Sequence, residues 1–394
     1  IRDKMLLPFI CFLFFLATMA VPIYVSPIKG CPGPCIGDTA QPYDHLWAAL
    51  QNFSSVSYDV DLILLNVVGN DHYLFIREEK TLNSATYYVN VPLITLKTNF
   101  TIKPLFCDEI DPALISTLSD KCISKDEKLT VYLKSEGFRL VTSKRLTIQN
   151  IVFDGIEDIA KVNSGVATST QYSCTTRRKR CCYPGLTNSN VTTALKCAQS
   201  TTITYTSTAN AMFTVQKASD RAELNFINTT FQYITFKALR GLIKVTSADK
   251  IYLKSIAIKT SVFPEGFLSY GTTNSSWNDI DFAIDDIEIA EYNYYNISLT
   301  SPNGALMTLP PENSAANFTI RNGIFRDFWL TDNSYLIYSP TPYTAQIENT
   351  VFSNILVAPK SKGVAYLFNI SSSSSLNISN SQFTRLEVKY NGRL

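Results

Sequence analysis

A nine-residue pattern recurs along this chain and constrains its fold more than any other feature. The pattern is Ile-x-Asn-x-x-Phe-x-x-Ile, with Phe or Leu replacing Ile in some copies. Five clear copies begin at Ile148, Phe226, Ile320, Ile347 and Ile378, and two degenerate copies begin at Leu253 and Ile284. Successive copies begin 27 to 36 residues apart, except the first two, whose separation of 78 residues leaves room for two divergent repeats. Self-similarity at such a period indicates a repeat architecture.

A second apolar segment precedes each copy of the pattern. These segments cover residues 138–141, 213–215, 242–245, 267–270, 306–309, 336–338 and 367–370. Short runs rich in Ile, Phe, Tyr and Thr that alternate in polarity are typical of β-strands. Gly, Asn, Ser and Pro fill the intervals between them, as in turns. Each repeat is therefore predicted to be a set of short strands.

The third position of the pattern is Asn in five copies and Ser or Asp in the other two. The seven residues are Asn150, Asn228, Ser255, Asp286, Asn322, Asn349 and Asn380. Asn and Asp tolerate the left-handed backbone region because their short side chains can bond locally. We therefore expect a sharp corner once per repeat, with side chains that could stack as a ladder.

These features predict an all-β chain in which residues 58–394 form a parallel β-helix solenoid. A β-sandwich is the alternative, but a sandwich would not normally carry one corner residue seven times. Residues 43–53 have the apolar spacing of a helix, and Asp44 is a plausible N-cap. A helix laid over the first strands would cover the exposed end of a solenoid. Residues 21–57 are thus predicted to be a Cys-containing segment with a capping helix.

The first 20 residues predict export. An apolar core from Met5 to Ala20 follows Lys4, and small residues stand at Thr18 and Ala20. This arrangement is typical of a cleaved signal peptide. The alternative is an uncleaved anchor, because apolar character continues to Val25 over about 21 residues, enough to span a bilayer.

Cysteine usage also favours export. Cys11 lies in the predicted signal peptide, which leaves an even number in three local groups. They are Cys31 and Cys35; Cys107 and Cys122; and Cys174, Cys181, Cys182 and Cys197. Proximity predicts pairing within each of the first two groups, as disulfides that pin loop excursions. The last four lie in a Cys-rich excursion at about 172–200 and allow three pairings, of which a Cys181–Cys182 bridge is the least favoured. Their spacing fits no common zinc site, and only His45 and His72 could assist.

Acceptor sequences for N-glycosylation are frequent. Asn-x-Ser/Thr occurs at Asn52, Asn99, Asn190, Asn228, Asn274, Asn296, Asn317, Asn369 and Asn377. Asn228 is also a corner residue, so a glycan there would compete with packing. Asn317 and Asn377 precede corners and would be usable only if their side chains point outward. The basic run Arg177–Arg180 resembles a processing site, although an exposed basic loop is the preferred interpretation.

Charge excludes some classes of partner. The chain has 35 basic and 33 acidic residues, a net charge of +2, whereas nucleic-acid binding favours a clear basic excess. One acidic stretch contains Asp279, Asp281, Asp285, Asp286, Glu288 and Glu291. It could hold a cation, but it lacks the loop of a calcium site, and a solvated strand face is favoured.

No catalytic constellation is evident in the sequence. The chain has no nucleophile-elbow motif, no Gly-rich phosphate loop and no metal-binding His pair. Paired carboxylates serve polysaccharide hydrolases, but Asp285-Asp286 lies within a repeat, where Asp286 takes the corner position. We therefore predict no catalytic residue, no cofactor and no metal site.

The helical pattern of residues 43–53, followed by strand patterns, resembles the opening of right-handed β-helix proteins of the pectate-lyase type. The segments 99–107, 131–140 and 148–158, with the Cys-Cys excursion at 174–197, resemble secreted or surface-anchored β-helix proteins of ciliated protists. That resemblance implies a right-handed β-helix without the catalytic residues of the lyases. Cys-rich modules and a membrane anchor often follow it in that family, whereas this sequence ends directly after a complete repeat.

An uncapped last repeat would leave open strand edges, which favour association. Self-association or a further chain segment is therefore expected at this end. The leading functional hypothesis is a structural extracellular glycoprotein, a rod in a surface coat, matrix or filament. The alternatives are a carbohydrate-binding or adhesive module, in which Tyr292, Tyr294 and Tyr295 could stack on sugars, and a polysaccharide lyase or hydrolase.

Overall fold

The computed structural model describes residues 20–26, 36–43, 46–66, 79–82, 85–88, 93–133, 138–154, 211–218, 221–232, 234, 241–259, 261, 263, 266–270, 281–290, 305–308, 317–330, 334–339, 344–357, 365–370, 375–388 and 392–393. Within these ranges the chain is all-β, and its α-helices are the short α2 (Leu46–Phe53) and α3 (Ile115–Leu118). Two 3-10 turns, η1 (Cys107–Glu109) and η2 (Pro112–Leu114), precede α3.

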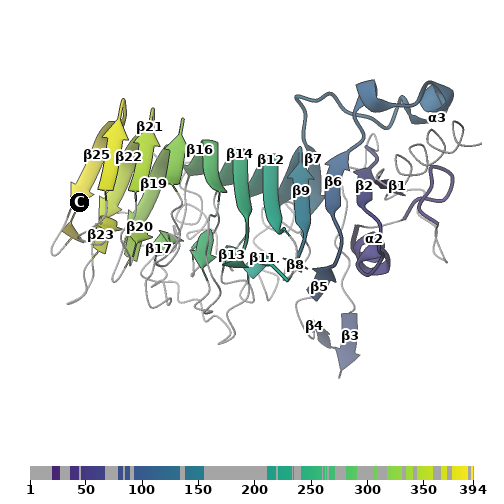
Figure 1. Ribbon diagram of the computed structural model, residues 1–394, viewed down its shortest axis with the longest axis horizontal. Helices are drawn as coiled ribbons and strands as arrows, with labels where there is room; N and C mark the ends of the chain where they lie inside the picture. Colours follow the sequence, from purple (N-terminus) through teal and green to yellow (C-terminus); the bar gives the residue numbers. More distant parts are fainter. Residues whose placement is uncertain are drawn as a thin grey trace, which may run out of the picture.

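The larger sheet runs the length of the molecule (Figure 1). Its main path is β1 (Val21–Val25), β2 (Val60–Leu64), β6 (Phe100–Pro104), β9 (Arg145–Gln149), β12 (Glu223–Gln232), β14 (Lys250–Lys259), β16 (Asp281–Ala290), β18 (Asn317–Arg321), β21 (Thr344–Glu348) and β24 (Ser375–Ser379). Every neighbouring pair on this path is parallel. The sheet also includes β7 (Leu129–Tyr132), β10 (Ile151–Asp154), β19 (Ile324–Leu330), β22 (Val351–Val357) and β25 (Gln382–Val388).

The second sheet is also parallel. Its strands are β5 (Leu93–Leu96), β8 (Arg139–Thr142), β11 (Ala211–Gln216), β13 (Gly241–Ser247), β15 (Leu268–Tyr270), β17 (Ala305–Thr308), β20 (Ser334–Ser339), β23 (Ala365–Ile370) and β26 (Gly392–Arg393). Each of the seven apolar segments predicted upstream of the repeats overlaps one of these strands. Beyond β11 the chain alternates between the two sheets, which differs from the antiparallel pairing of a β-sandwich. A separate antiparallel hairpin joins β3 (Glu79–Leu82) to β4 (Ala85–Tyr88).

Parallel register places equivalent repeat residues side by side. The first residue of each pattern copy pairs with the next, from Ile148 through Phe226 and on to Ile347, and these side chains are buried. The Phe of the pattern forms a second column, which is buried as far as Phe352, whereas Phe383 at its end is exposed. Within it the Phe325 and Phe352 rings stack at 5.2 Å, and Phe352 and Phe383 stack at 4.8 Å. Each fully buried ring contributes about 2–3 kcal/mol from the loss of water contact.

The interval of 78 residues does not hold two further repeats of the ladder. Strand β12 pairs directly with β9, and Phe226 lies opposite Ile148. Strand β11 likewise pairs directly with β8. No further strand of either sheet therefore lies between β9 and β12 or between β8 and β11. Spacing alone could not reveal this, because an insertion and divergent repeats lengthen the sequence in the same way.

The parallel sheet begins earlier than the pattern. Residues 21–25 form β1, which pairs with β2, although the sequence assigned them to the segment before the predicted solenoid. As an edge strand, β1 accommodates Pro22, which cannot donate a ladder hydrogen bond. Helix α2 contacts β1 and β2 and buries Leu46, Ala49 and Leu50. The predicted N-cap residue, Asp44, lies outside the described residues.

The predicted signal peptide up to residue 19 also lies outside the described ranges. Within those ranges, no helix has the length and apolar character needed to cross a membrane.

Candidate functional surface at the strand corners

All seven residues of the corner column have left-handed backbone conformations. The corner column is Asn150, Asn228, Ser255, Asp286, Asn322, Asn349 and Asn380, and their φ angles lie between 48° and 58°. This conformation costs most L-residues about 1–2 kcal/mol, and Asn or Asp lowers that cost by local hydrogen bonding. In β12, β14 and β16 the corner bends one long strand, whereas the other four corners separate two strands.

Side chains of the corner column bond to neighbouring strands. Asn349 Nδ2 donates to Asn322 Oδ1 at 3.5 Å, and Ser255 Oγ donates to an Asp286 carboxylate oxygen at 2.9 Å. The buried Asn150 differs, since its Nδ2 donates to the backbone carbonyls of Lys125 and Glu127, both at 2.7 Å. The predicted ladder thus exists as short pairs, because Asn, Ser and Asp at successive corners cannot all donate to one another.

After several corners the next residue has a hydroxyl side chain that hydrogen-bonds to backbone groups of the corner. Thr350 Oγ1 donates to the Glu348 carbonyl at 3.0 Å and accepts the Gly323 N–H at 3.3 Å. Ser381 Oγ repeats the arrangement, donating to the Ser379 carbonyl and accepting the Thr350 N–H at 3.1 Å. Polar backbone groups that the corner removes from the regular ladder would otherwise be buried without partners.

A second left-handed corner follows the first by five residues in the last three repeats. It is formed by Asp327, Asn354 and Arg385, with φ angles of 61°, 52° and 51°. Asn354 Nδ2 donates to Asp327 Oδ1 at 2.6 Å, a shorter bond than that between Asn349 and Asn322. This corner leaves no signal in the sequence, because Asp, Asn and Arg share no repeated identity.

Beside the second corner lies a charged cluster of Lys259, Glu288, Arg326 and Asp327. Glu288 pairs with Lys259 Nζ at 2.8 Å and with Arg326 at 2.8 Å, and Arg326 also pairs with Asp327 at 2.6 Å. Burial raises the pKa of Glu288, but hydrogen bonds from Lys259 and Arg326 outweigh burial and hold it below its usual value. These residues come from three successive repeats, so the cluster links neighbouring strands.

The corner at Asp286 places the acidic residues of this stretch in separate contacts. Asp285 accepts a hydrogen bond from Asn322 Nδ2 at 3.0 Å, Asp286 accepts from Ser255, and Glu288 belongs to the charged cluster. Asp281 lies in β16, while Asp279 and Glu291 lie outside the described residues. Within the described part of the chain, no group of three His, Cys, Asp or Glu side chains is arranged to hold a metal ion.

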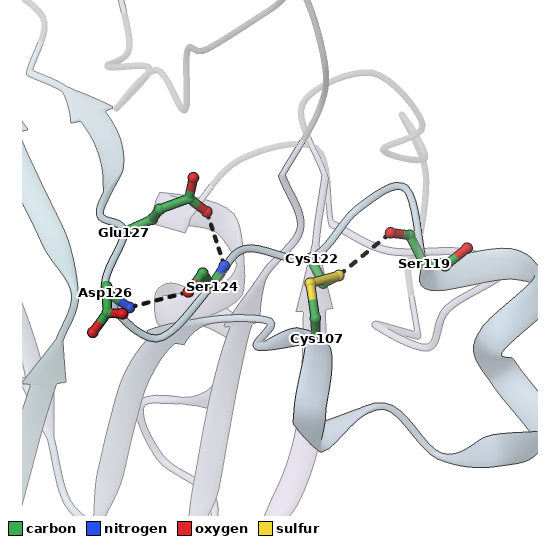
Figure 2. The surroundings of a disulfide bond; sticks show 6 residues. All are labelled: Cys107, Ser119, Cys122, Ser124, Asp126 and Glu127. Atoms are coloured by element: carbon green, nitrogen blue, oxygen red, sulfur yellow. Dashed lines mark hydrogen bonds between the residues drawn. A yellow bond between two sulfur atoms is a disulfide. The ribbon is translucent and has the colours of Figure 1, made fainter.

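A disulfide closes the loop after β6. Cys107 and Cys122, a pair predicted from proximity, are bonded with Cα atoms 4.9 Å apart (Figure 2). The loop between them includes α3, whose Leu118 packs on a small core with Ile63, Leu65 and Leu105. This loop therefore covers apolar residues of β2 and the segments that follow β2 and β6.

Several predicted residues lie outside the described part of the chain. They are Cys31, Cys35, Cys174, Cys181, Cys182, Cys197, His45, His72, Arg177–Arg180, Tyr292, Tyr294, Tyr295, Asn190, Asn274 and Asn296.

The described acceptor asparagines occupy different environments. Asn377 is exposed on β24, and its neighbours Leu376 and Ile378 align with buried residues of β21, so Asn377 points outward. Asn52 is exposed at the end of α2. Asn99 uses both amide atoms, donating to Asp59 at 3.0 Å and accepting from the Arg145 N–H at 3.1 Å.

The other three acceptors lie within strands. Asn228 is a half-buried corner residue, Asn369 is half-buried in β23, and Asn317 lies in β18. Glycosylation of Asn228 would place a sugar on a residue held in the left-handed conformation.

A group of three Tyr rings that sequence spacing does not predict lies near Asn369. The Tyr335 ring stacks on Tyr338 at 5.4 Å and on Tyr366 at 5.7 Å, and all three side chains are half-buried. The register of β20 and β23 brings them together, so their separation in sequence gave no signal.

Comparison with known proteins adds no assignment: no protein-family model, no curated protein and no solved structure matches this chain.

Proposed function

We propose that the two parallel sheets are walls of a right-handed parallel β-helix and that α2 caps its first strands. Three features support this architecture: the alternation of the chain between sheets, the residue-to-residue register and the recurrent left-handed corner. The right-handed sense of the proposed β-helix follows from the general preference of parallel crossover connections for right-handed turns.

We further propose that this β-helix is a structural rod of a secreted glycoprotein in a cell-surface coat, matrix or filament. The observation that carries the proposal is the pairing of outward polar side chains along the ladder. Glu288 links Lys259 to Arg326, Arg321 pairs with Glu348, and Asn354 bonds to Asp327. Each contact joins neighbouring repeats, an arrangement suited to stiffness along the axis. The similarity to surface β-helix proteins of ciliated protists is part of the same proposal.

The test begins with secretion from a eukaryotic cell line. We expect the protein in the medium, cleaved near residue 20, and a fall in mass after enzymatic removal of N-glycans. Ten strands spaced about 4.8 Å apart should give a rod about 45 Å long by electron microscopy. Material isolated from its natural source should then contain such rods in an ordered layer or fibre. Retention inside cells without glycans, or dispersed single particles in the source, would contradict the proposal.

We also propose that β24, β25 and β26, the last strands of the two sheets in the described chain, contact a second copy of the protein or a further chain segment. Phe383 is 43 % exposed there and continues the stacked Phe352 column. Exposed apolar edge strands template pairing with another chain. Sedimentation of the secreted protein should show concentration-dependent dimers that a Phe383→Lys substitution weakens, whereas Lys254→Ala, an exposed change away from this edge, should leave them intact.

Carbohydrate binding is the second candidate, and the Tyr335, Tyr338 and Tyr366 stack favours it. Half-exposed aromatic rings offer apolar faces with polar hydroxyl groups. Screening of the secreted protein against extracellular polysaccharides would test this function, and binding that survives replacement of Tyr335, Tyr338 and Tyr366 by Ala would exclude these rings as the site.

A further inference from the structure

We infer that Asn369 carries an N-linked glycan whose first sugar lies against Tyr338. This inference rests on the proposed secreted glycoprotein and identifies one acceptor with a prepared protein surface. Asn369 begins the acceptor sequence Asn-Ile-Ser, which ends at Ser371. In the parallel register of β20 and β23, Asn369 lies directly opposite Tyr338.

The surroundings of Asn369 suit a sugar. Tyr338 and Asn369 are both half-buried, so neither side chain is fully covered by protein. Tyr338 stacks on Tyr335, which in turn stacks on Tyr366, giving a group of three rings supported from two adjacent strands. A pyranose ring presents C–H groups on its face, and these pack favourably on the electron-rich face of an aromatic ring.

The hydrogen bonding of Asn369 is compatible with glycosylation. Asn369 shares a side-chain hydrogen bond with the Tyr335 hydroxyl. Attachment of N-acetylglucosamine replaces one of the two amide hydrogens on Nδ2 and leaves the other able to donate. Asn99 provides the contrast, since its amide and carbonyl atoms hold Asp59 and Arg145 in a half-buried turn. A sugar would extend the contacts of Asn369 but would disturb those of Asn99.

Asn377 provides the matched control. It lies on β24 and is exposed, and its register partner on β21 is Gln346 rather than an aromatic residue. Ser371→Ala and Ser379→Ala each abolish one acceptor sequence and leave the asparagine itself in place. They therefore compare a glycan beside Tyr338 with a glycan that has no aromatic register partner.

The experiment uses the full chain secreted from a eukaryotic cell line. Glycopeptide mass spectrometry should find Asn369 occupied, and Ser371→Ala should lower Tm by about 1–2 °C, more than Ser379→Ala does. Tyr338→Ala should lower Tm more in the wild-type background than in the Ser371→Ala background, because only the former has a sugar contact to lose. Tyr338→Phe retains the ring and should preserve most of the effect.

The outcomes separate this inference from the proposed function. An unoccupied Asn369 in a protein glycosylated elsewhere would overturn the inference and leave the glycoprotein proposal intact. Equal effects of Tyr338→Ala in the two backgrounds would overturn the sugar contact. Absence of glycan from every acceptor would overturn both.

Discussion

The first three strands of the larger sheet and its last three repeats continue one ladder but are stabilised differently. In both regions alternate apolar residues face the same core, as Leu62 does in β2 and Ile347 does in β21. After β6, however, the chain enters a loop closed by the Cys107–Cys122 disulfide. After β18, β21 and β24 it turns a left-handed corner and continues in a second strand.

This difference indicates that the corner is not required for parallel stacking. Register among β1, β2 and β6 is maintained without any left-handed corner residue in those strands. The corner instead determines the path of the chain after the strand, and the N-terminal region obtains an equivalent constraint from a covalent bond and from α2. Substitutions in the shared core should therefore affect both regions alike, while corner and disulfide substitutions should act locally.

The largest expected effect comes from the shared core. Phe352→Ala removes a fully buried ring from between Phe325 and Phe383 and should destabilise the fold by about 3–5 kcal/mol. Leu62→Ala should cost about 2–5 kcal/mol at the N-terminal end. Urea unfolding followed by circular dichroism measures both. Ser353→Ala, at the half-buried neighbouring position, is the control, and a Phe352→Ala effect no larger than this control would contradict the core assignment.

Removal of the disulfide should destabilise the N-terminal region and leave the C-terminal repeats unaffected. The Cys107→Ser, Cys122→Ser double variant frees a loop of 15 residues, whose closure is worth about 3 kcal/mol. Hydrogen exchange should increase in residues 100–123 and remain unchanged in residues 344–388. Mild reduction of the wild type should reproduce the result. Faster exchange spread evenly over both regions would show that they unfold as one cooperative unit.

A substitution at the corner should instead affect only the C-terminal repeats. Asn349→Ala keeps a Cβ at φ 50° but removes the side-chain amide that offsets the cost of this conformation by local hydrogen bonding. The variant should therefore cost about 1–2 kcal/mol of stability. Asn349→Gly removes the same bond to Asn322 but tolerates the conformation, so it should cost less. Exchange should rise in residues 344–357 only. If the Gly variant is at least as destabilised as the Ala variant, the side-chain bond and not the backbone conformation is what matters there.

The corner was predictable because its chemistry is local. A short polar side chain tolerates positive φ wherever it occurs, so Asn150 and Asn380 could be identified without knowing what lies beside them. Arg385 at the second corner could not, since nothing in an Arg side chain favours that conformation. Its neighbours in the stacked repeats impose the conformation, and the order of stacking is known only from the fold.

Other features could not be predicted from the sequence, for related reasons. Strand β1 was not predicted, because an apolar run of five residues that directly follows a longer apolar stretch of sequence has no periodicity of its own. The pairing of Glu288 with Arg326 depends on register between residues 38 apart in sequence. Register also brings Tyr335 and Tyr366 together. The sequence thus predicts local geometry well and lateral contacts poorly, although the contacts are what distinguish one surface from another.

The smallest expected effect concerns the charged surface and its dependence on pH. The pKa of Glu288 lies below its usual value of 4.5, so its pairing with Lys259 and Arg326 stabilises the folded state above that pH. Stability should fall as acid takes the pH below 4.5 and through the lower folded-state pKa. The cluster is partly exposed, which limits the loss to about 1 kcal/mol or less.

Glu288→Gln tests this assignment against a matched pair in the N-terminal region. The variant should lose the part of the acid sensitivity that comes from Glu288 when urea midpoints are compared at neutral pH and at about pH 3. A hydrogen bond from Lys125 also lowers the pKa of Asp108, but that pair is exposed beside the disulfide loop. Asp108→Asn should therefore change the acid sensitivity less than Glu288→Gln does. Equal behaviour of the two variants would mean that linking neighbouring repeats gives the Glu288 cluster no advantage over an isolated surface pair.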